Sequence, residues 1–153
     1  LDPTVEALSD GQILRVADTL LAGSIEQASA ALPRLTAVDS IGFAERVLYE
    51  DSAAQSTFVA LASVIGASPT DSTVADVVRG ANDIILAELV EPDAGAIDGI
   101  YISSQVDAQT RALALLEQLA AVADAPVLQS QLEVTVAVEQ AQLERARQIA
   151  ETL

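Results

Sequence analysis

Apolar residues recur at helical spacing along this chain, and an alternation of apolar and polar residues is nowhere sustained. Hydrophobic residues make up 51% of the sequence but aromatic residues only 3%, so the core must be built from Ala, Leu, Val and Ile. Such side chains suit close packing of helices, and the missing alternation argues against strands. We therefore predict an all-α fold. The first stripe is Ile13, Val16, Ala17, Leu20, Leu21, Ala28, Ala31 and Leu32.

Capping and breaking residues divide the chain into helices. Ser9 and Gln12 resemble a capping box at the start of the first long helix, and Pro33 ends or kinks it. Gly66 ends the second, and a lone Gly80 predicts an interruption in the segment that follows. The predicted helices cover residues 9–32, 38–65, one or two pieces of 74–90, 96–123 and 127–153. This order predicts a four-helix bundle in a single domain, residues 1–153, with an accessory helical segment between the second and third long helices.

Five residue types that proteins use for chemistry are missing from the chain. It contains no histidine, cysteine, methionine, lysine or tryptophan. An imidazole base, a thiolate nucleophile, a Schiff-base lysine and a zinc finger are therefore excluded. Serine and threonine are plentiful, but neither has an activating base. We predict a protein that is not an enzyme and has no catalytic residue.

The charge balance limits the partners of the chain. Seven basic residues face 23 acidic ones, which gives a net charge of −16. Nucleic acid and an anionic membrane surface both need clustered basic residues, so both are poor partners. The longest uncharged stretch, residues 52–70, contains Gln55, Gly66 and Pro69 and favours a soluble helix over a membrane span. An acid-rich sequence without Lys, Cys or Met suits an extracytoplasmic location: periplasmic, outer-membrane-associated or secreted. A GC-rich genome would also deplete Lys and Met.

Polar residues interrupt the apolar stripes near the middle of three long helices. Because the middles of antiparallel helices fall at about one level, we expect these side chains to form a buried polar layer. Hydrogen bonds within such a layer would fix the register of the helices. The layer consists of Asp51 and Gln55 on the second long helix, Gln109 on the third, and Glu139 and Gln142 on the last.

A metal site is the alternative interpretation of this layer, because helix bundles often hold carboxylate clusters. Di-iron bundles use a Glu-x-x-His pair, whereas this chain has Glu139 and Gln142 at that spacing. An amide offers only its carbonyl oxygen, which is a poor ligand for iron or zinc and an acceptable one for calcium.

Four short motifs, in order, resemble a ferritin-like bacterial family of unknown function whose members are often labelled predicted outer-membrane or periplasmic proteins. The resemblance covers almost the whole chain. It implies a ferritin-like bundle, and the positions of the family histidines are taken here by residues 50–52, Gln109 and Gln142. The motifs are Gly23-Ser24-Ile25-Glu26, the run from Phe43-Ala44 to Asp51, Ala96-Ile97-Asp98-Gly99-Ile100-Tyr101, and Gln142-Leu143 with Ala146.

These observations lead to two hypotheses of function. The first is a non-enzymatic bundle without a cofactor or metal, acting through a protein partner or through self-association as a homo-oligomer. Its apolar segment from Thr57 to Ile65 could pack against another copy. The second is a protein that binds Ca, Mn or Fe through a carboxylate cluster in the core. The resemblance and the acidic balance suggest Glu26, Glu50, Asp51 and Glu139 as its ligands.

Overall fold

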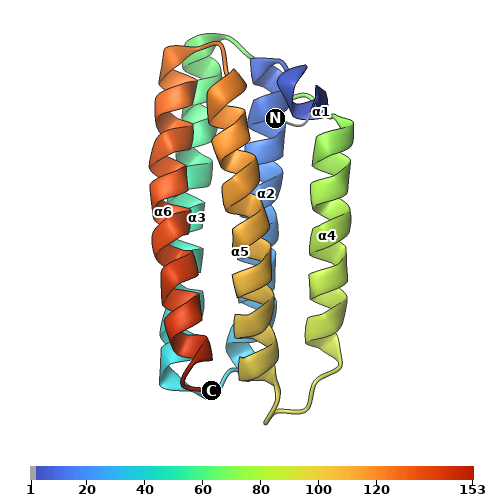
Figure 1. Cartoon of the computed structure of the whole chain (residues 1–153), viewed down its shortest axis with the longest axis vertical. Helices are drawn as coiled ribbons and strands as arrows, with labels where there is room; N and C mark the ends of the chain where they lie inside the picture. Colours follow the sequence, from blue (N-terminus) through green and yellow to red (C-terminus); the bar gives the residue numbers. More distant parts are fainter. Residues whose placement is uncertain (1–2) are drawn as a thin grey trace.

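The computed structural model describes residues 3–153 and contains only helices in that range, which confirms the all-α prediction (Figure 1). Six are α-helices, and a short 3-10 helix, η1, follows the second of them. The elements are α1 (Pro3–Glu6), α2 (Asp10–Ala31), η1 (Leu32–Arg34), α3 (Val38–Ile65), α4 (Thr73–Val90), α5 (Ile97–Val122) and α6 (Pro126–Ala150).

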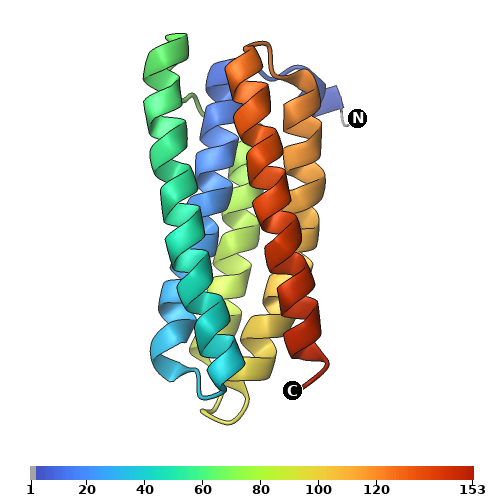
Figure 2. The ribbon, with the colours of Figure 1, turned by 90° about the vertical axis from the view of Figure 1, so that its left-hand side faces the viewer.

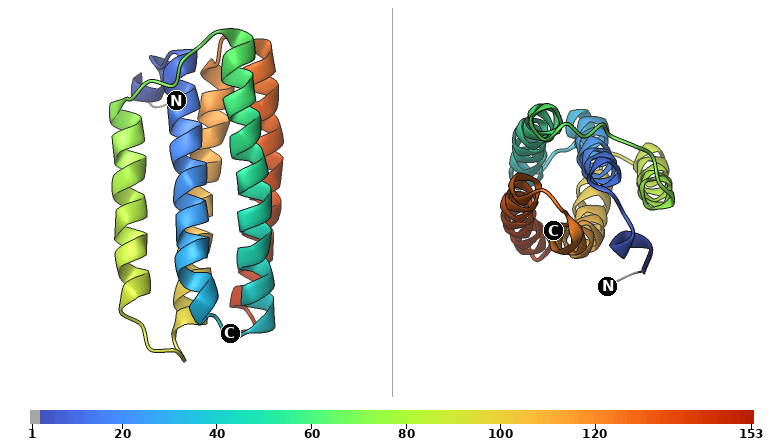
Figure 3. Two further views of the ribbon diagram at one scale, coloured as in Figure 1. Left: turned by 180° about the vertical axis from the view of Figure 1, so that it is seen from behind. Right: turned by 90° about the horizontal axis from the view of Figure 1, so that it is seen from above.

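Four of the long helices, α2, α3, α5 and α6, lie side by side along the long axis of the molecule, and each runs antiparallel to its neighbours (Figures 1 and 2). The view from above in Figure 3 shows them as a ring, in which α2 packs on α3 and α6 packs on both α3 and α5. Helix α4 lies outside this ring against α2, with a smaller contact to α5.

The helix ends follow the local signals in the sequence. The backbone N–H of Ser9 donates to Gln12 Oε1 at 3.0 Å, and the N–H of Gln12 donates to Ser9 Oγ at 3.3 Å, which completes the predicted capping box. Pro33 lies in η1, where α2 has already ended. Gly66 ends α3 with a φ of 69°, a left-handed conformation that favours glycine.

Helix α4 differs from the sequence prediction. The interruption expected near Gly80 is wrong, since α4 is continuous from Thr73 to Val90. A glycine inside a helix costs only about 1 kcal/mol relative to alanine. That cost is outweighed by burial of the opposite face, where Ala75, Ile85 and Leu89 belong to the apolar core.

Two helix starts receive their caps from distant parts of the chain. Helices α3 and α6 begin after Ala37 and Ala125, which have no side-chain cap of their own. The Asp98 carboxylate instead accepts from the N–H groups of Thr36 and Ala37, the latter at 2.9 Å. The Asp10 carboxylate similarly accepts from the N–H of Ala125 at 3.0 Å. These bonds tie α5 to the start of α3, and α2 to the start of α6.

The apolar core has two parts, one toward each end of the molecule. One contains Phe58 of α3 and Leu132 of α6. The other contains Val47 of α3 and Ala146 of α6. The middle of both helices therefore lies between the two clusters, at the level where the polar residues occur. No helix within residues 3–153 is long and apolar enough to cross a membrane.

Candidate functional site

The middle of the helix ring holds a hydrogen-bonded chain that ends on two carboxylates. Gln109 of α5 donates through Nε2 to Gln142 Oε1 of α6 at 3.0 Å. Gln142 in turn donates through Nε2 to Asp51 Oδ1 at 2.9 Å and to Glu50 Oε2 at 3.0 Å, both on α3. Gln109, Gln142 and Asp51 are all buried. We call these four residues the inner relay.

Glu139 adds a further buried acid to this region, one turn before Gln142 on α6. It is only 4% exposed. Burial, and then the negative charges of Asp51 and Glu50, raise the pKa of Glu139 to about 8. Burial also raises the pKa of Asp51, although the hydrogen bond from Gln142 partly opposes that effect. Glu139 and Asp51 therefore retain protons at pH values where a surface acid is fully ionised.

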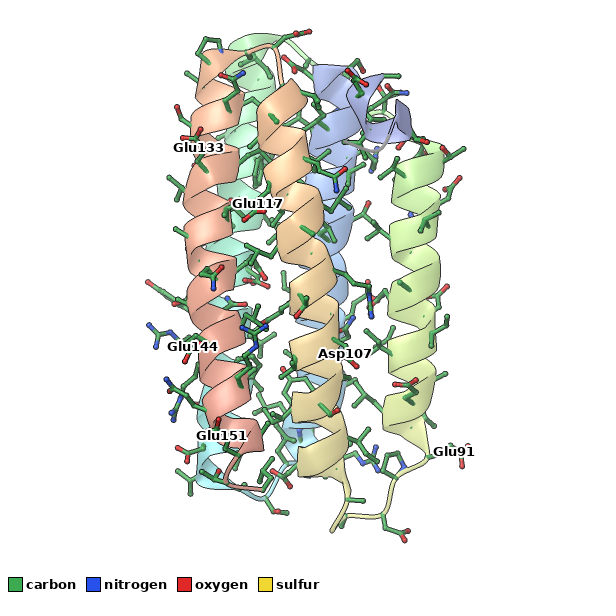
Figure 4. All side chains as sticks on the ribbon, in the orientation of Figure 1. Glu91, Asp107, Glu117, Glu133, Glu144 and Glu151 are labelled. Carbon is green, nitrogen blue, oxygen red and sulfur yellow. The ribbon has the colours of Figure 1, made fainter. Side chains whose placement is uncertain are left out.

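Most other acids lie on the outside of the molecule. Figure 4 labels six of them along α5, α6 and the end of α4, and all six are exposed. Water stabilises these charges, so their ionisation costs little. Asp51 of the inner relay and the neighbouring Glu139 are thus acids that lie buried among the helices. The labelled residues are Glu91, Asp107, Glu117, Glu133, Glu144 and Glu151.

Tyr101 and Ser24 border the inner relay. The side chain of Tyr101 is fully buried and contacts Phe43 edge-on at a centroid distance of 6.1 Å. Burial and the nearby Asp51 raise the pKa of Tyr101. The Tyr101 and Ser24 hydroxyls and Asp51 Oδ2 have no hydrogen-bond partner within the described residues, although Ser24 and Glu139 lie near enough to Asp51 to lower its pKa.

A second chain of amides links α5, α2 and α4. Gln105 donates through Nε2 to Gln27 Oε1 at 2.7 Å, and Gln27 donates through Nε2 to Asn82 Oδ1 at 2.8 Å. Asn82 then donates through Nδ2 to Glu26 Oε2 at 3.1 Å. Gln105 and Gln27 are buried, whereas Glu26 is exposed. We call these four residues the outer relay.

The carboxylate at the end of each relay determines the direction of its hydrogen bonds. A carboxylate accepts hydrogen bonds, so the side-chain NH₂ group of Asn82 must face Glu26, and that of Gln142 must face Glu50. Every earlier amide then has to donate toward the acid. The first residues of the two relays, Gln105 and Gln109, keep an Oε1 without a hydrogen-bond partner in residues 3–153. Each relay therefore begins with a free acceptor oxygen, at the end opposite its carboxylate.

Those two oxygens belong to residues that line the same cavity, which lies between α2, α4 and α5 and has a volume of about 190 Å³. Gln27, Asn82 and Glu139 line it as well. The remaining wall is mainly aliphatic, from Leu20, Leu21, Val77, Val78, Ile85, Leu115 and Leu116.

The structure brings only some of the predicted site residues together. Asp51, Gln109 and Gln142 belong to the inner relay, and Glu139 lies beside it. Gln55 is half-buried and donates to Asp18 Oδ1 of α2 at 3.1 Å, outside the relay. Of the suggested metal ligands, Glu50, Asp51 and Glu139 influence one another's charge, whereas Glu26 ends the outer relay.

The outer relay was missed at the sequence level. Gln105 lies one helical turn before Gln109, and this pair of amides on one face of α5 was an available signal. Gln27 and Asn82 gave no such signal, because each is a single polar residue whose partner lies on another helix. Gly23 permits their approach, since a Cβ at that position would stand 3.1 Å from Asn82 Cγ.

The inner relay, as arranged, does not fit the carboxylate metal site that is the alternative interpretation of the polar layer. Both Asp51 and Glu50 face the NH₂ group of Gln142, which is a donor and cannot ligate a cation. No group of three or more acids within residues 3–153 is placed to hold a metal ion. A cation there would need the Gln109 and Gln142 amides to turn over together, so that carbonyl oxygens replace the NH₂ groups.

Comparison with known proteins assigns the chain to one family. It belongs to the family described as a domain of unknown function (DUF4142), which matches residues 2–149. Neither a curated protein nor a solved structure matches the chain.

Proposed function

We propose that this protein is a non-enzymatic, ferritin-like four-helix bundle that acts outside the cytoplasm through assembly with a second copy of itself. One observation carries the assembly role: α3 has an exposed, nearly apolar stripe along one side. Its members recur at helical spacing, and the Thr57 hydroxyl is already bonded to the Ala53 carbonyl at 3.1 Å. The stripe is Ala53, Thr57, Ala60 and Val64, all exposed.

A second copy is the partner that the charge pattern favours. The stripe lies within residues 52–70, which contain no acid and no base, although the whole chain has a net charge of −16. Two copies can therefore meet there without bringing carboxylates together. Small side chains at Ala53 and Ala60 also let two α3 helices approach closely around a two-fold axis.

The inner relay supports a structural role for the polar core in this proposal. Gln142 satisfies one oxygen of Asp51 and one of Glu50 without a metal ion. Such internal pairing favours one register of α3, α5 and α6 over the alternatives, as buried polar groups do in other helical assemblies.

Native mass spectrometry with a pair of charge-matched variants tests the assembly. We expect a dimer for the unaltered protein, a monomer for Ala60→Glu, and a dimer for Ala121→Glu. The last variant adds the same charge at an exposed position on α5. A monomeric unaltered protein, or equal dissociation of both variants, would overturn self-association.

A cation site is the second candidate function, and the specific observation in its favour is the set of acids around Gln142. Burial raises the pKa values of Asp51 and Glu139, and the negative charge of Glu50 adds to the rise in both. A bound Ca²⁺, Mn²⁺ or Fe²⁺ would displace those protons, with the Gln142 amide turned to present its carbonyl oxygen.

Native mass spectrometry also tests this second candidate function, through the mass of any bound metal ion. Desalted protein is exposed separately to Ca(II), Mn(II) and Fe(II), and stoichiometric adducts are sought. The control is Asp51→Asn with Glu139→Gln, which preserves side-chain size and removes two charges. An adduct on the unaltered protein alone would support the site, and no adduct with any of the three would refute it.

A further inference from the structure

The cavity between α2, α4 and α5 combines an aliphatic wall with unsatisfied acceptors. Its volume of about 190 Å³ is below the 300–1,000 Å³ typical of pockets for drug-sized ligands, so it suits a short molecule. Exposed residues Val77 and Arg111 line it next to buried ones such as Leu116, so it extends from the surface into the core.

The polar groups at the buried side of the cavity lack donors. Gln105 and Gln109 are 0% and 3% exposed, and each has an Oε1 without a hydrogen-bond partner in the described chain. Their orientations are enforced by the acids that end the two relays, so neither amide can turn without breaking its relay. A buried acceptor left unpaired is destabilising, and a donor on a bound ligand would remove that cost.

A buried acid lies on the same cavity. Glu139 lines it from α6, and its nearest charged neighbours are the acids Asp51 and Glu50. The sequence contains no lysine, and Arg111, the only basic residue along the wall, is exposed on α5. The buried side of the cavity thus offers two carbonyl oxygens and one carboxyl group, with no cation from the protein.

We propose that this cavity binds a small primary alkylammonium ion. Its three N–H donors match Gln105 Oε1, Gln109 Oε1 and the carboxyl group of Glu139, which releases its proton to solvent when the cation binds. The short aliphatic chain of the ligand contacts the wall formed by Leu20, Val78 and Ile85. An alcohol of equal length has a single donor and no charge, and a fatty acid carries the wrong charge. This inference does not rest on the proposed assembly through α3.

Titration with three amphiphiles of similar length tests the head group. The probes are n-pentylammonium chloride, 1-pentanol and sodium hexanoate, followed by NMR of the side-chain amides of Gln105 and Gln109. We expect saturable shifts with pentylammonium, binding at least about tenfold weaker with pentanol because two donors are lost, and none with hexanoate. Equal binding of pentylammonium and pentanol would overturn the proposal, as would absence of saturation.

Two substitutions separate the cavity from the acidic surface. Ala81 lines the cavity and is half-buried, so Ala81→Leu fills part of it without touching either relay. Ala114 is exposed on α5 and does not line it, so Ala114→Leu is the matched control. We expect Ala81→Leu to weaken pentylammonium binding at least about tenfold and Ala114→Leu to leave it unchanged. Equal affinity of both variants would place the ammonium on the surface and refute the site.

A final experiment tests whether the bound ammonium group belongs to a free amine or to a lysine side chain of a partner protein. The side chain of lysine carries the same ammonium head on a four-carbon stem, so a partner protein could supply it. We assign the site to a free amine, and expect Nα-acetyl-lysine methylamide to bind at least about tenfold more weakly because its backbone must stay outside a cavity of this size. Equal or tighter binding of the lysine derivative would overturn the free-amine assignment.

Discussion

The inner and outer relays use the same amide chemistry and differ in where their acids lie. Both run from a buried glutamine of α5 through a second glutamine toward a carboxylate. The inner relay ends on the fully buried Asp51 and on Glu50, with Glu139 close by. The outer relay reaches the exposed Glu26 through Asn82.

Because of that difference, the outer relay orders the helices without making stability depend on pH, whereas the region of the inner relay does both. Glu26 lies at the surface, where water stabilises its charge, so the outer relay ends on an acid that is not buried. The inner relay lies in a medium that disfavours charge, and the pKa of the neighbouring Glu139 rises to about 8 through burial and the charges of Asp51 and Glu50. One pattern of hydrogen bonds thus has two energetic consequences, which depend on the burial of the anchor.

The largest expected effect comes from adding one more acid to each relay. Gln142→Glu removes the donor shared by Asp51 and Glu50 and places another carboxyl group among buried acids. We expect a loss of about 3–5 kcal/mol, or about 10 °C in Tm, at neutral pH. Asn82→Asp makes the matching change beside exposed Glu26 and should cost less than about 1 kcal/mol. Thermal unfolding of both variants compares them, and similar losses would show that anchor burial is unimportant.

The next effect is a dependence of stability on pH that only the inner relay produces. The pKa of Glu139 is raised from 4.5 to about 8, so the folded state holds a proton that the unfolded state releases. The associated stability is fully present below about pH 4.5 and is lost as pH rises through about 8. Between about pH 6 and about pH 9 we expect a fall of about 2 kcal/mol, or about 5 °C in Tm.

Few other side chains titrate between about pH 6 and about pH 9, because the chain has no histidine, cysteine or lysine. Glu139→Gln should therefore flatten most of the pH dependence of Tm. Retention of the full slope in that variant would assign the slope to another group, and a flat profile of the unaltered protein would show that Glu139 is already ionised in the folded protein.

Local signals in the sequence were enough to predict most helix boundaries. The capping box at Ser9, the left-handed Gly66 and the break at Pro33 act within one helical turn, so they can be found without tertiary information. Gly80 was misread for a related reason. Its local cost is real, but the burial of Ile85 and Leu89 that offsets it depends on the position of α2 and α5.

The candidate site was predictable only where polar residues interrupt an apolar stripe. Heptad spacing placed Asp51, Gln109, Glu139 and Gln142 on inward faces, because burial on a regular helix follows its period. No pattern in the sequence identifies Asp98 as a helix cap. It accepts hydrogen bonds from backbone N–H groups at the start of another helix, 61 and 62 residues away. The donor-to-acceptor direction of the hydrogen bonds in each relay likewise depends on contacts between helices, and residue spacing on a single helix does not reveal those contacts.

Breaking the outer relay should produce a smaller loss that does not vary with pH. Gln27→Met removes the partner of Gln105 Nε2 and of Asn82 Oδ1 while nearly preserving side-chain volume. We expect a cost of about 1–2 kcal/mol, equal at about pH 6 and about pH 9. Urea unfolding at both values measures it. A cost that changes with pH would mean that the two relays are coupled through Gln105 and Gln109, which lie one turn apart on α5.

The smallest effect compares two glycines, one that touches the outer relay and one that touches nothing. A Cβ at Gly80 of α4 meets no atom within 4 Å, so Gly80→Ala should stabilise the protein by about 0.5–1 kcal/mol through helix propensity alone. A Cβ at Gly23 of α2 would stand 3.1 Å from Asn82 Cγ and Oδ1 and must displace that side chain. Gly23→Ala should therefore gain less than Gly80→Ala in urea unfolding. If the two gains are equal, Asn82 moves freely, and the outer relay does not constrain the contact between α2 and α4.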